Sequence, residues 1–247
     1  MQCLTGALFL LLCTSAARGW LKDLDPYKNL ITVIHNFYRS YETRAADMKE
    51  MKWDDGLQRK AEMWSENCYF DHQRDGLGEN LAFVVTGGPD MQDLDIIVHS
   101  CRGWWNEVYN WTWSTACVRA CHYTQMIWGK TERLGCSLSK CPQMQVDTGK
   151  NMDDIDFFVC FYDPPGNSIG KYPYTLGEPC SHCDRLDECH GGLCKSPSLN
   201  NSNSSPTTNT QPQSEATLTD SAMTDANVYT PSRAAPSQEL NVVHKYL

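Results

Sequence analysis

The sequence predicts an α+β sandwich, because three helical patterns alternate with short strand-like runs within the first 195 residues. Thirteen cysteines are too many for a chain that is kept reduced, unless they bind metal, so we expect an oxidising compartment. The formal net charge of −9 excludes a nucleic-acid binder, which needs a basic surface. These observations predict a secreted, disulfide-bonded domain.

Three segments carry apolar residues at helical spacing. The first helix is expected to begin at Asp25 as N-cap, with Pro26 at the first helical position, and the second near Asp54. The third covers about residues 92–109. The expected buried faces are Tyr27, Leu30, Ile31, Ile34, Tyr38 and Tyr41 in the first helix, Leu57, Ala61, Trp64 and Cys68 in the second, and Leu94, Ile97, Val98, Cys101, Trp104, Trp105 and Val108 in the third.

Four short runs rich in β-branched and aromatic residues are bounded by Gly, Pro or Asp, which is typical of strands. They are residues 80–85, 124–128, 134–138 and 155–162. Most of the tryptophans fall on core positions of the predicted helices and strands. Trp111 and Trp113 do not, so they are the better candidates for an apolar contact surface.

The two ends of the chain differ from its middle. Residues 1–19 have the pattern of a signal peptide, with cleavage after Ala17 or Gly19. Residues 196–247 are rich in Ser, Thr, Asn and Pro, so we expect a disordered, glycosylated tail whose removal leaves the fold intact. The last residues contain neither a GPI signal nor a membrane anchor. Glycosylation sequons occur at Asn110, Asn200 and Asn203.

Residues 171–195 are expected to be a small cysteine-rich hinge. The cysteines within it are Cys180, Cys183, Cys189 and Cys194. Since His182 and His190 are interleaved with them, a zinc module is one interpretation. Zinc clusters usually pair two close doublets across a longer gap, and the expected compartment is oxidising, so two small-loop disulfides are favoured.

Four motifs then occur together in the order and spacing of one family. They are HNFYR at 35–39, GENL at 78–81, HYTQMIW at 122–128 and FVCFYDPPGN at 158–167. Together they resemble the CAP superfamily of cysteine-rich secretory proteins, antigen 5 and pathogenesis-related 1 proteins. The match spans about residues 25–195, and the segments at 131–136 and 177–183 look most like its peptidase inhibitor 16 branch.

The resemblance implies a three-layer α-β-α sandwich over residues 20–170, with a cleft lined by two histidines and two glutamates. The corresponding residues in this chain are His72, Glu79, Glu107 and His122. Imidazoles and carboxylates together suit a divalent cation such as zinc, with positions left for water, although none is required for the fold. The alternative is a hydrogen-bonded polar patch without metal.

The resemblance also implies three disulfides in this domain, which are Cys68–Cys141, Cys136–Cys160 and Cys117–Cys121. Removal of Cys3 and Cys13 with the signal peptide leaves an odd number of cysteines, and Cys101 is left over. We expect a monomer in which Cys101 is a buried thiol on the third helix, although this thiol also allows a covalent dimer.

Two residues depart from the family pattern. Cys121 stands where glycine usually precedes the motif histidine, so a positive φ there would strain Cys121 or rebuild the loop. Phe161 replaces the usual asparagine after the strand cysteine and adds apolar surface. His35, in the first helix, is expected to be a packed structural histidine.

Three functions remain open from the sequence. The first is a secreted, non-enzymatic binding protein that takes a sterol, a fatty acid or an extracellular protein, as the resemblance implies. The second is a peptidase inhibitor, which depends on the branch name alone, because the sequence shows no braced reactive loop. The third is a metal-dependent hydrolase, which is disfavoured because there is neither a Gly-x-Ser-x-Gly elbow nor a His-Glu-x-x-His helix.

Overall fold

The computed structural model describes residues 18–85, 92–146, 149–197 and 242–244. The signal peptide predicted over residues 1–19 therefore lies outside the described residues except for its last two positions. Two of the sequons, Asn200 and Asn203, also lie outside them, whereas Asn110 is exposed at the end of a short 3-10 helix. None of the described helices has the length and apolar character that a membrane crossing requires.

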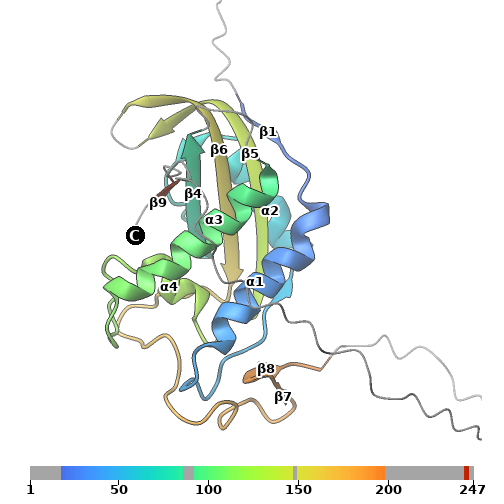
Figure 1. The fold of residues 1–247 in the computed structure, drawn as a ribbon, viewed down its shortest axis with the longest axis vertical. Coiled ribbons are helices and arrows are strands. Elements are labelled where there is room, and N and C mark those ends of the chain that lie inside the picture. Colours follow the sequence, from blue (N-terminus) through green and yellow to red (C-terminus); the bar gives the residue numbers. More distant parts are fainter. Residues whose placement is uncertain (1–17, 86–91, 147–148, 198–241, 245–247) are drawn as a thin grey trace, which may run out of the picture. The chain divides into compact units, whose positions relative to one another are not determined.

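A mainly antiparallel sheet forms the centre of the fold (Figure 1). Its order in the described residues is β1-β5-β6-β4-β9, and the short strands β2 and β3 pair in parallel with β5 outside this path. The strands are β1 (Trp20–Leu21), β2 (Lys52–Trp53), β3 (Tyr69–Phe70), β4 (Gly78–Val85), β5 (Arg133–Val146), β6 (Asn151–Asp163) and β9 (Val242–His244). The runs predicted at 80–85, 134–138 and 155–162 are confirmed as parts of β4, β5 and β6.

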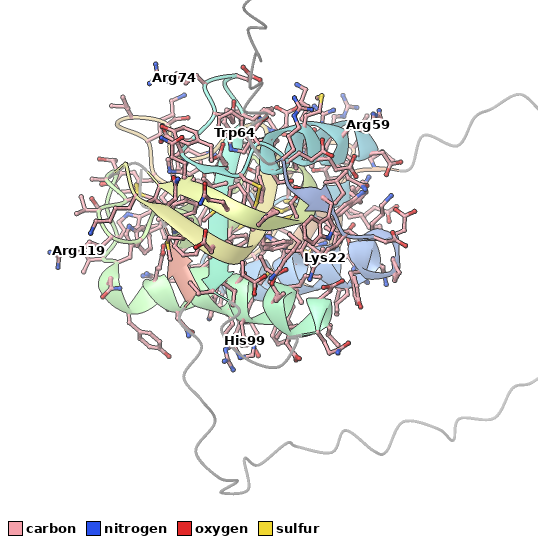
Figure 2. All side chains as sticks on the ribbon, turned by 90° about the horizontal axis from the view of Figure 1, so that it is seen from above. Lys22, Arg59, Trp64, Arg74, His99 and Arg119 are labelled. Atoms are coloured by element: carbon pink, nitrogen blue, oxygen red, sulfur yellow. A yellow bond between two sulfur atoms is a disulfide. The ribbon has the colours of Figure 1, made fainter. Side chains whose placement is uncertain are left out.

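Helices cover both faces of this sheet. Figure 2 shows Arg59 and Trp64 of α2 on one side of the sheet and His99 of α3 on the other. The helices are α1 (Lys28–Ser40), α2 (Asp55–Ser65), α3 (Asp93–Asn106) and α4 (Cys121–Met126), with 3-10 turns η1 (Asp25–Tyr27) before α1 and η2 (Glu107–Asn110) after α3. The three predicted helices are therefore confirmed.

Consecutive residues of a strand contribute side chains to the two cores in turn, because each face of the sheet is covered by helices. On β4, Ala82 and Val84 belong to the core that α1 and α3 cover, whereas Leu81 and Phe83 belong to the core that α2 covers. Successive side chains of a strand point to opposite faces, so a strand between two helical layers is apolar at nearly every position. The three-layer α-β-α sandwich that the resemblance implied is confirmed.

The predicted helix boundaries and faces need small corrections. Asp25 lies inside η1, and Leu24 occupies the cap position without a side-chain cap. Asp54, by contrast, caps α2 by accepting the N–H of Leu57 at 2.9 Å. The residues expected to be buried but found exposed are Tyr41, Leu94 and Val98, at 59%, 41% and 36%.

Residues 124–128 do not form the predicted strand, because most of them belong to α4. Glu107 causes this difference. Its Oε2 accepts the N–H groups of His122 (3.0 Å) and Tyr123 (3.3 Å), and a carboxylate at a helix N-terminus satisfies donors that the helix itself leaves open. Every residue of α4 is buried, so its aromatic and β-branched composition reflects burial and not strand structure.

The disulfides match those that the resemblance implied. The pairs are Cys68–Cys141, Cys117–Cys121, Cys136–Cys160, Cys180–Cys189 and Cys183–Cys194. The hinge cysteines therefore form two disulfides and not a zinc module. Cys101 is a fully buried free thiol, and burial raises its pKa to about 12, so it should resist alkylation in the folded protein. A covalent dimer through Cys101 is incompatible with this burial.

The cysteine-rich hinge is joined to the sandwich by main-chain hydrogen bonds. Cys194 N–H donates to Met48 O at 2.7 Å, and Glu50 N–H donates to Cys194 O at 2.9 Å. Lys49 Nζ adds an ion pair to Asp187 at 2.6 Å. The hinge also contains a small hairpin formed by β7 (Glu188–His190) and β8 (Leu193–Lys195).

The end of the chain contributes β9 to the free edge of β4. The pairing is antiparallel and runs from Ala82 opposite His244 to Val84 opposite Val242. An edge strand has unpaired main-chain groups, which an extended segment can satisfy. The structure thus differs from the predicted disordered tail at residues 242–244, and the rest of the tail from residue 198 lies outside the described residues.

Candidate functional site

His72 and Glu79 form the first side-chain pair of the site. His72 lies between β3 and β4, and Glu79 is the second residue of β4. His72 Nδ1 donates to Glu79 Oε1 at 2.7 Å, and Glu79 Oε2 accepts the N–H of Gln73 at 3.0 Å. Because an ionised carboxylate only accepts, this bond fixes the proton on Nδ1. His72 Nε2 is buried and has no hydrogen-bond partner among the described residues.

His122 and Glu107 form the second pair. Glu107 begins η2, His122 is the second residue of α4, and His122 Nδ1 donates to Glu107 Oε1 at 2.6 Å. The side chains are nearly inaccessible, at 2% and 4% exposure. The imidazole also stacks on Trp104, with ring centroids 6.1 Å apart and planes 13° apart. Each glutamate therefore orients one histidine through the same kind of bond.

A buried hydrogen-bond chain joins α1 to this site. His35 Nδ1 donates to Ile31 O (2.8 Å), and His35 Nε2 accepts from the hydroxyl of Tyr162 (2.9 Å). Asn80 Nδ2 donates to that hydroxyl (3.2 Å) and to His122 O (3.1 Å). Burial lowers the pKa of His35 to about 4, so this histidine is neutral and structural, as predicted. Since Asn80 follows Glu79 on β4, both His–Glu pairs are anchored at the same end of that strand.

Gln125 of α4 brings the motif segments together. Its Oε1 accepts the N–H of Gly166 at 2.8 Å. A Cβ atom added at Gly78 would lie 2.3 Å from Gln125 Oε1, and one at Gly166 would lie 2.7 Å from it, so neither position has room for a side chain. Asn167 Nδ2 donates to Cys121 O at 2.9 Å, which ties the last motif to the start of α4.

The four predicted site residues thus lie as two oriented pairs. Within the described part of the chain, no three His, Cys, Asp or Glu side chains come together as a group that could hold a metal ion. Both carboxylates are engaged with imidazole Nδ1 atoms and main-chain N–H groups. In the pair formed by His72 and Glu79, the nitrogen left for a cation or a polar ligand is Nε2 of His72.

Comparison with known proteins identifies the family. The family model described as "CAP: Cysteine-rich secretory protein family" matches residues 33–162, which is more than half of the chain and includes all four site residues. The chain belongs to the CAP family. The fold, the disulfides and the positions of the four motifs agree with that assignment.

Named relatives refine the position within the CAP family. Human peptidase inhibitor 16 is 35% identical over 195 residues, which are 76% of this chain and 40% of the relative. Mouse GLIPR1-like protein 1 is 33% identical over 70% of this chain and 72% of its own length. The likeness to the peptidase inhibitor 16 branch is confirmed, although the chain spans only about 40% of that human relative.

Solved CAP structures support the same fold. The crystal structure of NaASP2 with Zn2+ is 27% identical, covers 69% of this chain and 95% of its own, and has a TM-score of 0.58. The structure of BmVAL-1 is 26% identical, covers 71% of this chain and 97% of its own, and has a TM-score of 0.59. The zinc ion is a component of the NaASP2 crystal structure.

The two departures from the CAP pattern have simple structural outcomes. Cys121 is not among the residues with positive φ, so it carries no strain of that kind and begins α4 within the disulfide to Cys117. Arg119 has the positive φ instead, at 61°. Phe161 is 2% exposed and packs in the core that α2 covers, so its added apolar surface is buried.

Two cavities of the CAP domain lie apart from the His–Glu pairs. The larger, of about 830 Å³, and a neighbour of about 450 Å³ share Trp128, Lys171 and Pro173 among their walls. None of the four site residues lines either cavity. Trp113, which the sequence assigns to a contact surface, is half-buried and lines the larger one.

Two aromatic residues of this wall were not expected from the sequence. Tyr172 and Tyr174 belong to the first residues of the hinge, where no helix or strand pattern was expected. Their aromatic-proline-aromatic spacing, with Pro173 between them, was the available signal.

Proposed function

We propose that this chain is a secreted, non-enzymatic CAP-domain binding protein whose two His–Glu pairs hold a divalent cation such as zinc. The observation that carries the proposal is the Nδ1–carboxylate bond, at 2.7 Å in one pair and 2.6 Å in the other. A histidine that ligates metal through one nitrogen usually donates from the other to a carboxylate. The relation of this chain to a CAP protein crystallised with Zn2+ adds support.

The donor set suits an open site. His72 and His122 would supply their Nε2 atoms, with Glu79 and Glu107 orienting the rings from behind. Two imidazoles leave coordination positions for water or for a ligand oxygen, unlike a closed structural zinc site with four protein ligands. When bound, the cation would supply Lewis acidity for holding an anionic or polar ligand group.

Calorimetric zinc titration tests this proposal. The wild-type chain should bind zinc, the double variant His72→Ala/His122→Ala should not, and a His190→Ala control should bind as wild type because His190 is an exposed hinge residue. Binding should weaken on acidification, because protonated imidazoles cannot ligate. Circular dichroism would show whether the double variant is folded, and Glu79→Gln provides a milder change. Equal zinc affinity in all four proteins would contradict a role for these histidines.

A peptidase and esterase screen on the same proteins tests the absence of catalysis. The described site offers acid–base groups in its imidazoles and carboxylates, but a hydrolase also needs a positioned nucleophile or an activated water. We expect no turnover above a heat-denatured control. Turnover that the double variant loses would establish the hydrolase instead.

We further propose that the ligand is a sterol, a fatty acid or an extracellular protein. The exposed apolar face of α1 supports this proposal. Val33, Phe37 and Tyr41 are 52%, 54% and 59% exposed and follow one another at intervals of four residues, so they form an apolar stripe. The rings of Phe37, Tyr38 and Trp105 continue this surface toward α3. A lipid-extraction assay should give bound sterol or fatty acid with wild type and less with Phe37→Ser/Tyr41→Ser.

Peptidase inhibition is the second candidate, because the relatives named peptidase inhibitor 16 and peptidase inhibitor 15 are 35% and 36% identical. Titration of serine, cysteine and metalloproteases with the purified chain tests it. Stoichiometric inhibition of one protease class would support this candidate, and unchanged protease activity throughout would remove it.

A further inference from the structure

The larger cavity, whose wall includes the segment after β6 and the start of the hinge, has the properties of a ligand site of its own. Its volume of about 830 Å³ lies within the range of small-molecule sites, and its wall is mainly aromatic and proline side chains with a few polar groups. The residues on which the argument depends are Asp47, Trp113, Lys130, Lys171, Tyr172 and Tyr174.

A stacked aromatic pair forms a platform in this wall. Trp113 and Tyr172 have ring centroids 4.9 Å apart and planes only 6° apart, and Tyr174 contacts Trp113 at 4.9 Å. Tyr174 is 7% exposed, whereas Tyr172 is 50% exposed. Tyr172 therefore offers a ring that is held in place by its neighbours and remains open to solvent.

The charged groups around the platform favour an anion. The carboxylate of Asp47 accepts from Thr175 N–H (2.8 Å) and Thr175 Oγ1 (2.9 Å) and lies 3.4 Å from Lys130 Nζ, so its charge is already compensated. Lys130 keeps 57% of its side chain exposed, and Lys171 is exposed and takes part in none of the ion pairs of the described residues. Asp47, Lys130 and Lys171 together thus give the wall one net positive charge, in a chain whose formal net charge is −9.

We propose that this cavity binds an acidic saccharide, a sugar ring that carries a carboxylate or a sulfate. The flat face of a pyranose stacks on Tyr172, and its acidic group lies between Lys130 and Lys171. Neither lysine can be satisfied by a purely apolar ligand, and an aromatic floor without the lysines would not select a charged one.

The neighbouring cavity extends the site to more than one sugar unit. It shares Trp128, Lys171 and Pro173 with the larger cavity, and Ser114 and Thr115 add hydroxyl groups that suit sugar hydroxyls. Lys171 lies at the boundary of both cavities, so it can contact the acidic groups of two successive units. The site uses none of the His–Glu residues and is independent of zinc.

Tryptophan fluorescence of the full chain tests this inference, because Trp113 and Trp128 lie in the wall. A heparin-derived tetrasaccharide should change the emission saturably and with unchanged affinity in EDTA, whereas neutral maltotetraose should not change it and palmitate should not displace the tetrasaccharide. Affinity should fall about five- to tenfold in Tyr172→Ala, through lost stacking, and about three- to fivefold in Lys171→Gln. The affinity of Lys171→Gln should also depend less on salt.

Matched controls keep the test specific. Tyr109→Ala removes a tyrosine that is 88% exposed and outside both cavities, and Lys60→Gln removes an exposed lysine of α2, so both should bind as wild type. Tyr172→Ala should keep the wild-type melting temperature, because Tyr172 is half exposed. Equal binding of maltotetraose, displacement of the tetrasaccharide by palmitate, equal loss in the control variants, or no response to any probe would each overturn the proposal.

Discussion

At the scale of single residues, Arg39 shows how a buried charge can organise loops. It is fully buried, and its guanidinium donates to main-chain oxygens and not to a carboxylate. Burial lowers the pKa of Arg39 to about 9, which still leaves it protonated in neutral solution. The carbonyl groups that it satisfies are those of Lys49, Met126, Trp128, Gly129 and Thr131. One side chain of α1 thereby connects the end of α4 to the segment that holds the hinge.

Replacement of Arg39 by methionine should destabilise the fold by about 3–5 kcal/mol, because several buried carbonyl groups lose their donor at once. Arg39→Lys should cost less, since lysine keeps the charge but has fewer donors in a different geometry. Urea unfolding followed by circular dichroism measures both free energies. A loss below about 1 kcal/mol in Arg39→Met would show that water replaces the guanidinium.

His35 gives the fold a defined pH dependence. Its pKa is lowered to about 4 by burial, below the ordinary value of 6.5, so the unfolded chain binds a proton there that the native chain does not. The contribution of neutral His35 to the free energy of unfolding is fully present above about pH 6.5, and it is lost as the pH falls toward 4. Linkage gives a loss of about 2 kcal/mol by pH 5.

Urea unfolding at pH 7 and pH 5 checks this expectation. The loss of unfolding free energy between the two pH values should be about 2 kcal/mol smaller in His35→Gln than in wild type. The exposed His190→Gln serves as control and should keep the wild-type difference. If His35→Gln and wild type lose the same unfolding free energy between pH 7 and pH 5, burial of His35 is not the cause of the loss of stability in acid.

At the scale of elements, α4 depends on Glu107 both for its start and for the orientation of His122, which lies 15 positions later in the chain. Glu107 bonds the first N–H groups of α4 with one oxygen and orients His122 with the other. The carboxylate of Glu107 therefore both caps the helix and orients the imidazole ring of His122. The same helix carries Gln125, which occupies the space that Gly78 and Gly166 leave open.

The variant Glu107→Gln should separate these two roles. The amide oxygen can still accept from the N–H groups of α4, so the loss of stability should be only about 1 kcal/mol. An amide donor toward Nδ1 would oppose the tautomer that presents Nε2, so zinc affinity should fall about 10- to 100-fold. Calorimetry and thermal melting measure the two effects, with the exposed Glu188→Gln as control. Unchanged zinc affinity would argue against an orienting role for Glu107.

At the scale of the whole molecule, the hinge and the end of the chain both attach to the sandwich through main-chain bonds. The hinge meets residues 48–50 through Cys194, and β9 pairs with the outer edge of β4. Since Glu79 and Asn80 lie on the same strand as the residues that β9 covers, the end of the chain is close to the candidate site along β4.

Removal of all residues after Lys195 should expose the edge of β4. We now expect faster hydrogen exchange at the amides of residues 82–84, with unchanged exchange at residues 134–138 of the central strand β5. The variant Val243→Pro in the full chain should reproduce the effect, because proline removes a donor from the ladder. The melting temperature should change by only a few degrees, since three residue pairs are lost. Identical exchange in all three proteins would show that the edge is open without truncation.

The sequence by itself determined the features that repeat locally. Helical spacing located α1, α2 and α3, and β-branched runs located β4, β5 and β6. The motifs led to the CAP family, to the cysteine pairs that this resemblance implies and to the four candidate site residues. Such features depend on short-range periodicity or on a recognisable order of residues, which the linear chain displays directly.

Only the tertiary structure decided which groups meet. Residues 124–126 have strand-like composition but belong to α4, because Glu107 supplies the acceptor at the N-terminus of this helix. The pairing of each glutamate with one histidine and the aromatic cavity around Tyr172 likewise join segments that local pattern does not connect. The pairing of β9 with β4 is a further contact between segments that are distant in the sequence. These contacts form when hydrogen-bonding groups that folding would bury find partners far away in the sequence, and no local propensity encodes that choice.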